Sequence, residues 1–142
     1  MILIDVNVLV YAHREAADNH PRYKKWLLDV INGETAYGLS ELVLSSFIRI
    51  VTHPQIFNPP STLKEALAFI TQIKSPPNCI IVRSGLRHWE IFETLCHQSG
   101  AKGNLVPDAY LAALAIESGC EWMTTDRDFT RFPGLKVRHP LE

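Results

Sequence analysis

Short apolar runs alternate along the chain with longer segments in which apolar residues recur every three or four positions. The first run, residues 2–4, has no polar alternation, which is typical of a strand buried on both faces of a parallel sheet. Comparable runs predict strands at residues 35–39, 79–82 and 121–125, and a short edge strand at 135–138. Strands of this length that alternate with longer helices indicate a parallel sheet covered by helices.

The segments between the runs predict helices, several of them with recognisable ends. One helix starts near Pro21, after Asn19 or His20, continues to Ile31 and ends at Gly33. Further helices are predicted at 6–13, at 41–51 behind a Ser40 cap, from a cap at Ser61 or Thr62 to 73, at 86–97 before Gly100, and at 107–117 before Gly119. With 142 residues and no linker or repeat, the chain is expected to form one α/β domain over residues 1–142.

The composition is that of a folded protein with no overall attraction to nucleic acid. The chain is 46% hydrophobic and its formal net charge is −1, so RNA binding would require a local basic patch or metal ions. No apolar run approaches the roughly 20 residues that span a bilayer, and the start of the chain does not have the features of a signal peptide. Three widely spaced cysteines fit neither a disulfide framework nor a zinc site, which predicts reduced thiols and a cytoplasmic location.

Three acidic residues occur where predicted strands give way to helices or turns. Asp5 and Asp126 each follow a predicted strand directly, and Glu41 opens the helix after the second strand. Because the carboxyl ends of parallel strands form the ligand crevice of such a sheet, these acids are expected at one edge.

A fourth acid, Asp108, shares a helical face with Leu111, Ala112 and Ala115. A carboxylate on a face that packs against a sheet is costly unless it is paired or binds a cation. Four carboxylates in one place are tolerated only around a cation, and ligands that are all oxygen favour Mg²⁺ or Mn²⁺. The pattern therefore predicts a divalent cation site.

Each acid also has a structural role available that requires no metal ion. Asp5 can cap the helix that follows it, and the helix dipole favours Glu41 and Asp108 in the first turn of any helix. Asp126 and Asp128 suit a turn before a short helix. It is the joint placement of the acids, and not any one of them, that favours a catalytic site.

The same residues resemble the motifs of PIN-domain nucleases, and most closely those of VapC-type toxins from bacterial toxin–antitoxin pairs. Residues 2–8 resemble the family's first strand and leading acid, and residues 40–43 resemble its second acid on a helix. Residues 103–115 and 124–129 resemble the third and fourth motifs. The four motifs occur in the family's order and spacing, whereas residues 52–83 match only as generic helix and loop.

The resemblance implies a three-layer α/β/α sandwich around a central, mainly parallel sheet of four to five strands. It also implies a metal-dependent endoribonuclease whose one or two Mg²⁺ or Mn²⁺ ions are held by Asp5, Glu41, Asp108 and Asp126. Because water and not the 2′-hydroxyl is then the nucleophile, the products carry 5′-phosphate and 3′-hydroxyl ends. Residues expected to orient the acids or a water are Asn7, Thr124 and Asp128, and candidate RNA contacts beside the site are Lys102 and Arg127.

Three partners are implied by the same resemblance: an RNA substrate such as tRNA or another structured RNA, a cognate antitoxin, and a second copy of the chain in a homodimer. The antitoxin is expected near the helical residues 23–31 and 42–51. A basic antitoxin tail would compete for the acidic site because of its charge.

Two other functions are weighed against this one. Haloacid-dehalogenase-like phosphohydrolases also place an acid after the first strand, but they require a second acid where this chain has Asn7. They also require a later catalytic lysine, for which the chain offers no convincing candidate. A PIN-fold protein that only binds RNA or acts as a scaffold would not need all four acids, and this chain has them.

Overall fold

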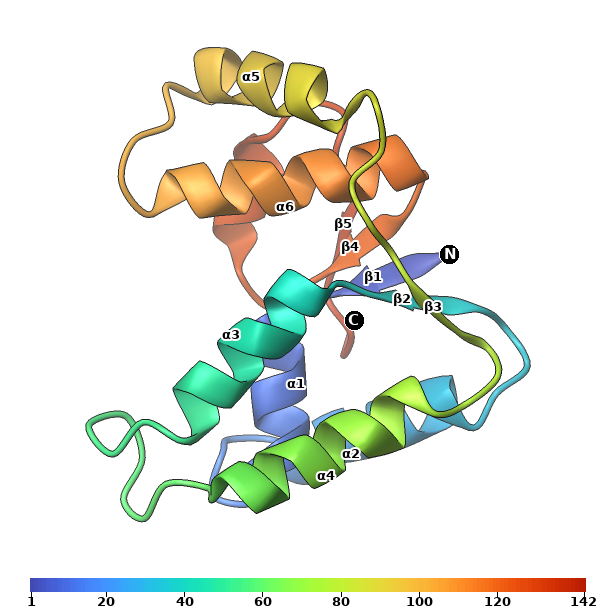
Figure 1. Ribbon diagram of the computed structural model, residues 1–142, viewed down its shortest axis with the longest axis vertical. Coiled ribbons are helices and arrows are strands. Elements are labelled where there is room, and N and C mark those ends of the chain that lie inside the picture. The colour runs from blue at the N-terminus through green and yellow to red at the C-terminus, as the bar shows by residue number, and fades with distance from the viewer.

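The computed structural model describes residues 1–142 and contains five strands and six α-helices (Figure 1). In chain order these are β1 (Ile2–Ile4), α1 (Val6–His13), α2 (His20–Ile31), β2 (Tyr37–Leu39), α3 (Glu41–Val51), α4 (Leu63–Lys74), β3 (Cys79–Ile81), α5 (His88–Ser99), α6 (Leu105–Ser118), β4 (Glu121–Met123) and β5 (Val137–Arg138). A 3₁₀-helix, η1 (Arg127–Arg131), connects the last two strands. The alternation of strands and helices confirms the predicted α/β class.

The sheet has the strand order β3-β2-β1-β4-β5, with every pair of neighbours parallel. A mainly parallel sheet was predicted, and the sheet is parallel throughout. The segment with η1 leads from the carboxyl end of β4 back to the edge where the strands begin, so β5 runs parallel to β4. The central strand, β1, pairs with β2 on one side and with β4 on the other. The boundary between β1 and β4 is therefore the topological switch point, at which open α/β sheets bind ligands beyond the carboxyl ends of their strands.

Helices cover both faces of the sheet (Figure 1). The two helices between β3 and β4, α5 and α6, lie on one side, and α1, α2 and α4 lie on the other. This division follows from the reversal of strand order, because right-handed crossovers that proceed in opposite directions place their helices on opposite faces. Core residues buried between the layers include Leu3, Tyr37, Phe47 and Trp122.

Three local predictions differ from the structure. The strand over 79–82 was expected to be buried, but β3 lies at the edge of the sheet and Ile80 is 45% exposed. The last long helix begins at Leu105, slightly earlier than expected, but Pro107 lies in its first turn as predicted, where the helix does not use the N–H group that proline lacks. Ser40 occupies the N-cap position of α3 without a side-chain hydrogen bond, whereas Thr62 forms a full capping box at α4.

The cysteines are as predicted from their spacing. Cys79, Cys96 and Cys120 are all free thiols; Cys120 is buried and the other two are partly buried. They act as packing residues. None of the helices combines the length and the apolar character that crossing a bilayer requires.

Candidate metal centre

Asp5 lies at the carboxyl end of β1, beside the switch point, and is almost fully buried. Its Oδ1 accepts a hydrogen bond from the Val6 N–H at 2.7 Å, so it is the N-cap of α1. Its Oδ2 accepts hydrogen bonds from the Thr124 hydroxyl at 2.7 Å and from the Asn7 side-chain amide at 3.2 Å. Asp5 therefore caps α1, as its position in the sequence allows. In addition, its carboxylate is held by the hydroxyl of Thr124, near the other end of the chain.

Thr124 joins Asp5 to Asp126 through its hydroxyl group. Besides donating to Asp5, Thr124 Oγ1 accepts hydrogen bonds from Asn7 Nδ2 at 3.1 Å and from the Asp126 N–H at 3.0 Å. Asn7 Oδ1 accepts from the Thr125 N–H at 3.2 Å, which closes the network. The ends of β1 and β4 are thus fixed relative to each other. Asn7 and Thr124 were predicted to orient a carboxylate, and their hydrogen bonds to Asp5 are of the kind that this role requires.

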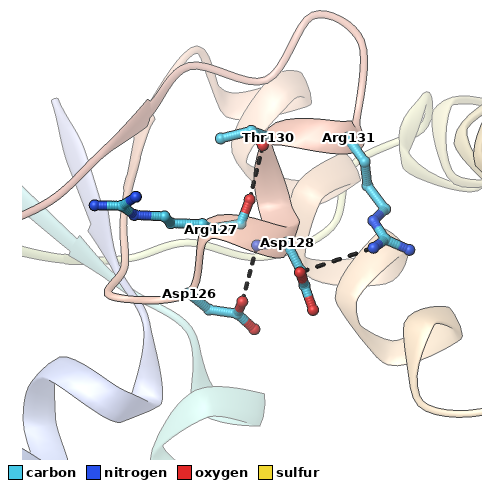
Figure 2. Close-up of polar contacts among 5 residues, drawn as sticks. All are labelled: Asp126, Arg127, Asp128, Thr130 and Arg131. Carbon is cyan, nitrogen blue, oxygen red and sulfur yellow. Dashed lines mark hydrogen bonds and ion pairs between the residues drawn. The ribbon is translucent and has the colours of Figure 1, made fainter.

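Asp126 and Asp128 lie at the start of η1 with their carboxylates on the same side of the turn (Figure 2). Asp126 Oδ1 accepts a hydrogen bond from the Asp128 N–H at 2.9 Å and so caps η1. The exposed Asp128 carboxylate lies 3.8 Å from the Arg131 guanidinium. Arg127 points away from both carboxylates (Figure 2), and Lys102 is exposed in the turn before α6. Neither cation forms an ion pair with the acids.

Asp108 is half-buried in the first turn of α6. Because the other end of α6 leads directly into the start of β4, this first turn lies toward the carboxyl ends of the strands. The pKa of the Asp108 carboxyl is raised to about 6, first by burial and then by the negative charges of Asp126 and Asp128. The prediction that this acid lies on a face packed against the sheet agrees with the complete burial of Ala112 and Ala115 on the same face.

The charge of Asp5 is affected by the same neighbours. Burial raises the pKa of Asp5 to about 6; the hydrogen bonds from Thr124 and Val6 act in the opposite direction. The negative charges of Asp108 and Asp126 raise it as well. Mutual repulsion therefore links Asp5, Asp108 and Asp126, which come from three separate parts of the sequence.

Glu41 lies apart from this group. It opens α3 at the carboxyl end of β2, and its side chain is 58% exposed. Its Oε1 lies 3.4 Å from the guanidinium of Arg83, which follows β3. Its charge is not among those that raise the pKa of Asp5 or Asp108. The structure thus brings three of the four predicted acids together and leaves Glu41 at the rim with Arg83. The sequence marked Arg83 only as one of several candidate phosphate contacts and did not predict its pairing with Glu41.

The donor set suits a hard divalent cation, although no three of the chain's His, Cys, Asp and Glu side chains are arranged to hold a metal ion as they stand. The clustered donors are carboxylate oxygens, which Mg²⁺ and Mn²⁺ prefer. Burial is the main reason why the pKa values of Asp5 and Asp108 are raised; the neighbouring carboxylates raise them further, and Arg131 lowers that of Asp108. Acids with such shifts at a strand-end crevice are candidates for a functional site.

Residues 2–135 match the family model of the PIN domain. The chain belongs to the PIN domain family. This membership sets aside the haloacid-dehalogenase-like alternative. The PIN domain is 39% identical over 142 residues to Ribonuclease VapC43 of Mycobacterium tuberculosis, and the match covers 100% of this chain and 97% of that protein. It is thus a full-length homologue of a VapC ribonuclease.

Solved structures show the same PIN fold. VapBC2 from Rickettsia felis, bound to a DNA fragment from its promoter, superposes with a TM-score of 0.70 at 19% identity, and the match covers 98% of each chain. A toxin–antitoxin complex from Klebsiella pneumoniae superposes with a TM-score of 0.64 at 17% identity, covering 100% of this chain and 99% of that chain. The three-layer arrangement expected from the PIN motifs is confirmed.

Proposed function

We propose that the chain forms a single PIN domain that acts in the cytoplasm as a metal-dependent endoribonuclease, the toxin of a VapBC-type toxin–antitoxin pair. The homology to Ribonuclease VapC43 over the whole chain supports the activity and the class of substrate. The observation that carries the proposal is the convergence of Asp5, Asp108 and Asp126 at the switch point of the sheet. A divalent cation bound there would offset the repulsion among these carboxylates.

In the proposed mechanism, Asp5, Asp108 and Asp126 hold Mg²⁺ or Mn²⁺, one ion or two, with Glu41 contributing from the rim. When bound, the cation lowers the pKa of the attacking water and offsets negative charge on the phosphodiester. Thr124 and Asn7 hold the Asp5 carboxylate in one orientation, so that it need not reorganise during the reaction. Attack by water leaves 5′-phosphate and 3′-hydroxyl ends on the RNA.

The ion pair between Glu41 and Arg83 does not oppose this role. Both side chains are more than half exposed. Exposed pairs of this kind contribute at most about 1 kcal/mol, which is less than a divalent cation gains from a carboxylate ligand. Glu41 is therefore free to exchange Arg83 for the cation, and Arg83 then becomes available to an RNA phosphate.

The toxin assignment includes a cognate antitoxin, a homodimer and a structured RNA substrate such as tRNA. The Klebsiella pneumoniae relative was crystallised as a toxin–antitoxin complex, which supports an antitoxin for this chain. The helical residues 23–31 and 42–51 are the proposed antitoxin surface. Support comes from Leu42, an apolar side chain that is 47% exposed at the start of α3.

The test is cleavage of a panel of structured RNAs, tRNA included, by protein purified free of antitoxin. We expect cleavage with Mg²⁺ or Mn²⁺, and its loss with EDTA or with Asp126→Asn. The matched control is Asp29→Asn, which changes an exposed acid on α2 that is paired with Lys25. Cleavage that survives EDTA and the substitution would contradict the mechanism. Wild-type protein that binds RNA and cuts nothing would favour the binding-only alternative.

A further inference from the structure

Two hollows meet at Thr125, the residue that precedes Asp126. The larger has a volume of about 470 Å³ and lies between α1, the start of α2 and the loop after α3. The smaller, of about 270 Å³, lies at the carboxyl ends of β4 and β5. Thr125 lines both of them, so a molecule that reaches the acids through either hollow passes the same side chain.

Aromatic rings and polar groups line the larger hollow. The rings of Tyr11 and Tyr23 have their centroids 5.2 Å apart; Tyr23 is buried, and Tyr11 is partly exposed. Phe57 lies on the loop after α3, and the Arg14 guanidinium is 4.3 Å from its ring centroid. Hydrogen bonds from Arg14 to Ser61 Oγ and to a backbone carbonyl hold that arrangement. Phe57 is thus held in place by Arg14, and the volume falls within the roughly 300–1,000 Å³ of small-ligand sites.

The smaller hollow is lined by cationic, hydroxyl and carboxylate side chains. Its lining includes Arg127, Arg138, His139 and Thr130, together with the carboxylates of Asp126 and Glu142. Arg138 pairs with Glu121 at 3.3 Å, whereas Arg127 forms no ion pair. The ring of His139 lies 6.3 Å from that of Tyr23, which lines the larger hollow. Arg127, the unpaired arginine of this lining, suits a phosphate group.

We propose that the two hollows form a nucleotide subsite, in which one unpaired base stacks on Tyr11 and its phosphate lies against Arg127. The inference rests on the proposed ribonuclease function and specifies its substrate: the RNA must present an unstacked nucleotide next to the cleaved bond. Aromatic rings bind unpaired bases by stacking, and side chains such as Asp18 and Asn19 at the rim can bond the base edges. An RNA fits this subsite better than a peptide because the aromatic hollow adjoins both the acid cluster and the hollow lined by Arg127, which can bind a phosphate.

The test compares two probes in EDTA, which prevents cleavage. One is a labelled single-stranded RNA pentamer, and the other is a pentamer of abasic nucleotides that keeps every phosphate. Wild-type protein is expected to bind the intact pentamer about 5- to 100-fold more tightly, as stacking of one base implies. This comparison needs no variant. Tyr11→Leu should weaken binding of the intact pentamer by a similar factor and leave the abasic pentamer unchanged, whereas Arg127→Gln should weaken both.

Two control variants test whether the Tyr11 ring itself binds the base. Tyr11→Phe keeps the ring and should bind as wild type does, and Trp89→Leu removes a ring that is 60% exposed on α5 and should change neither affinity. Equal binding of both pentamers by wild-type protein would overturn the proposal. So would a Tyr11→Leu variant that weakens antitoxin binding and leaves RNA binding intact, since the hollow would then belong to a protein partner. If the protein cleaves RNA with metal but binds both pentamers equally, only the proposed subsite is contradicted. If it binds the intact pentamer more tightly but cleaves no RNA, only the proposed ribonuclease activity is contradicted.

Discussion

At the scale of single residues, the acid site depends on the hydroxyl group of Thr124. This group donates one hydrogen bond to Asp5 and accepts two others, from Asn7 and Asp126. Thr124 is buried, so bulk water cannot replace the hydroxyl if it is removed. A buried carboxylate that loses a donor costs about 1–3 kcal/mol, and its pKa would rise further because the Thr124 hydrogen bond lowers it.

We therefore expect Thr124→Val to lower the rate of metal-dependent RNA cleavage about 10- to 100-fold, as loss of an orienting hydrogen bond typically does. The valine keeps the shape of the side chain, so circular dichroism should show an unchanged fold. Thr124→Ser restores the hydroxyl and should recover most of the rate. Equal rates for valine and wild type would show that the hydroxyl does not orient Asp5.

At the scale of elements, the turn between Arg83 and α5 is held by a contact between the end of α6 and the start of α5. Arg87 occupies the N-cap position of α5 without a capping side chain. Instead Glu117, on α6, accepts hydrogen bonds from the Gly85 N–H at 2.7 Å and from the Arg87 N–H at 2.9 Å. A Cβ atom at Gly85 would lie 2.7 Å from Glu117 Oε2, so a larger residue there would make the Glu117 side chain shift.

Removing this anchor with Glu117→Ala is expected to lower the free energy of unfolding by about 1 kcal/mol, because two backbone donors lose their acceptor. Amide hydrogen exchange should speed up at Gly85 and Arg87 and stay unchanged in β1. Glu34→Ala, at an exposed acid outside the helices, provides the control. Unchanged exchange at Gly85 would mean that the turn is held by other contacts.

The sequence predicted features within one element more accurately than contacts between elements. Asp5 follows its strand directly, as predicted, because strand ends are local features. Asp126 lies at the same edge of the sheet but not directly after its strand, since β4 ends at Met123 and not at Thr125. The pairing of Glu41 with Arg83 could not be foreseen, since it joins residues 42 positions apart whose distance depends on strand order. The exposure of β3 was missed for the same reason: an apolar run does not reveal whether the strand is central or at an edge.

At the scale of the whole molecule, the acid cluster lowers stability when no metal is bound. In the unfolded chain an aspartate loses its proton near pH 4, whereas in the folded protein Asp5 and Asp108 keep theirs until about pH 6. The folded state therefore binds more protons between these values, and stability is lost as the pH rises from about 4 to about 6. Above pH 6 the full penalty remains until a cation neutralises it.

Asp108→Asn should accordingly stabilise the metal-free protein at pH 7.5 by about 1 kcal/mol, a figure reduced from the full pKa shift because the side chain is only half-buried. The gain should shrink to less than half at pH 4.5. Mg²⁺ should stabilise the wild type more than the variant at pH 7.5, through binding to the folded state. Urea unfolding in EDTA and in Mg²⁺ at both pH values measures these effects. A gain that does not depend on pH would exclude charge repulsion as its cause.

The hydrogen bond between Asp5 and Thr124 spans 119 positions of the chain and has a consequence for the timing of activity during synthesis. A ribosome adds about 5–20 residues per second, so Asp5 emerges several seconds before β4 does. Until β4 pairs with β1, neither Asp126 nor the Thr124 hydroxyl can reach Asp5. On the proposed mechanism, the nascent chain therefore cannot cut RNA until nearly all of it has been translated, which leaves time for an antitoxin that is already present to bind it first.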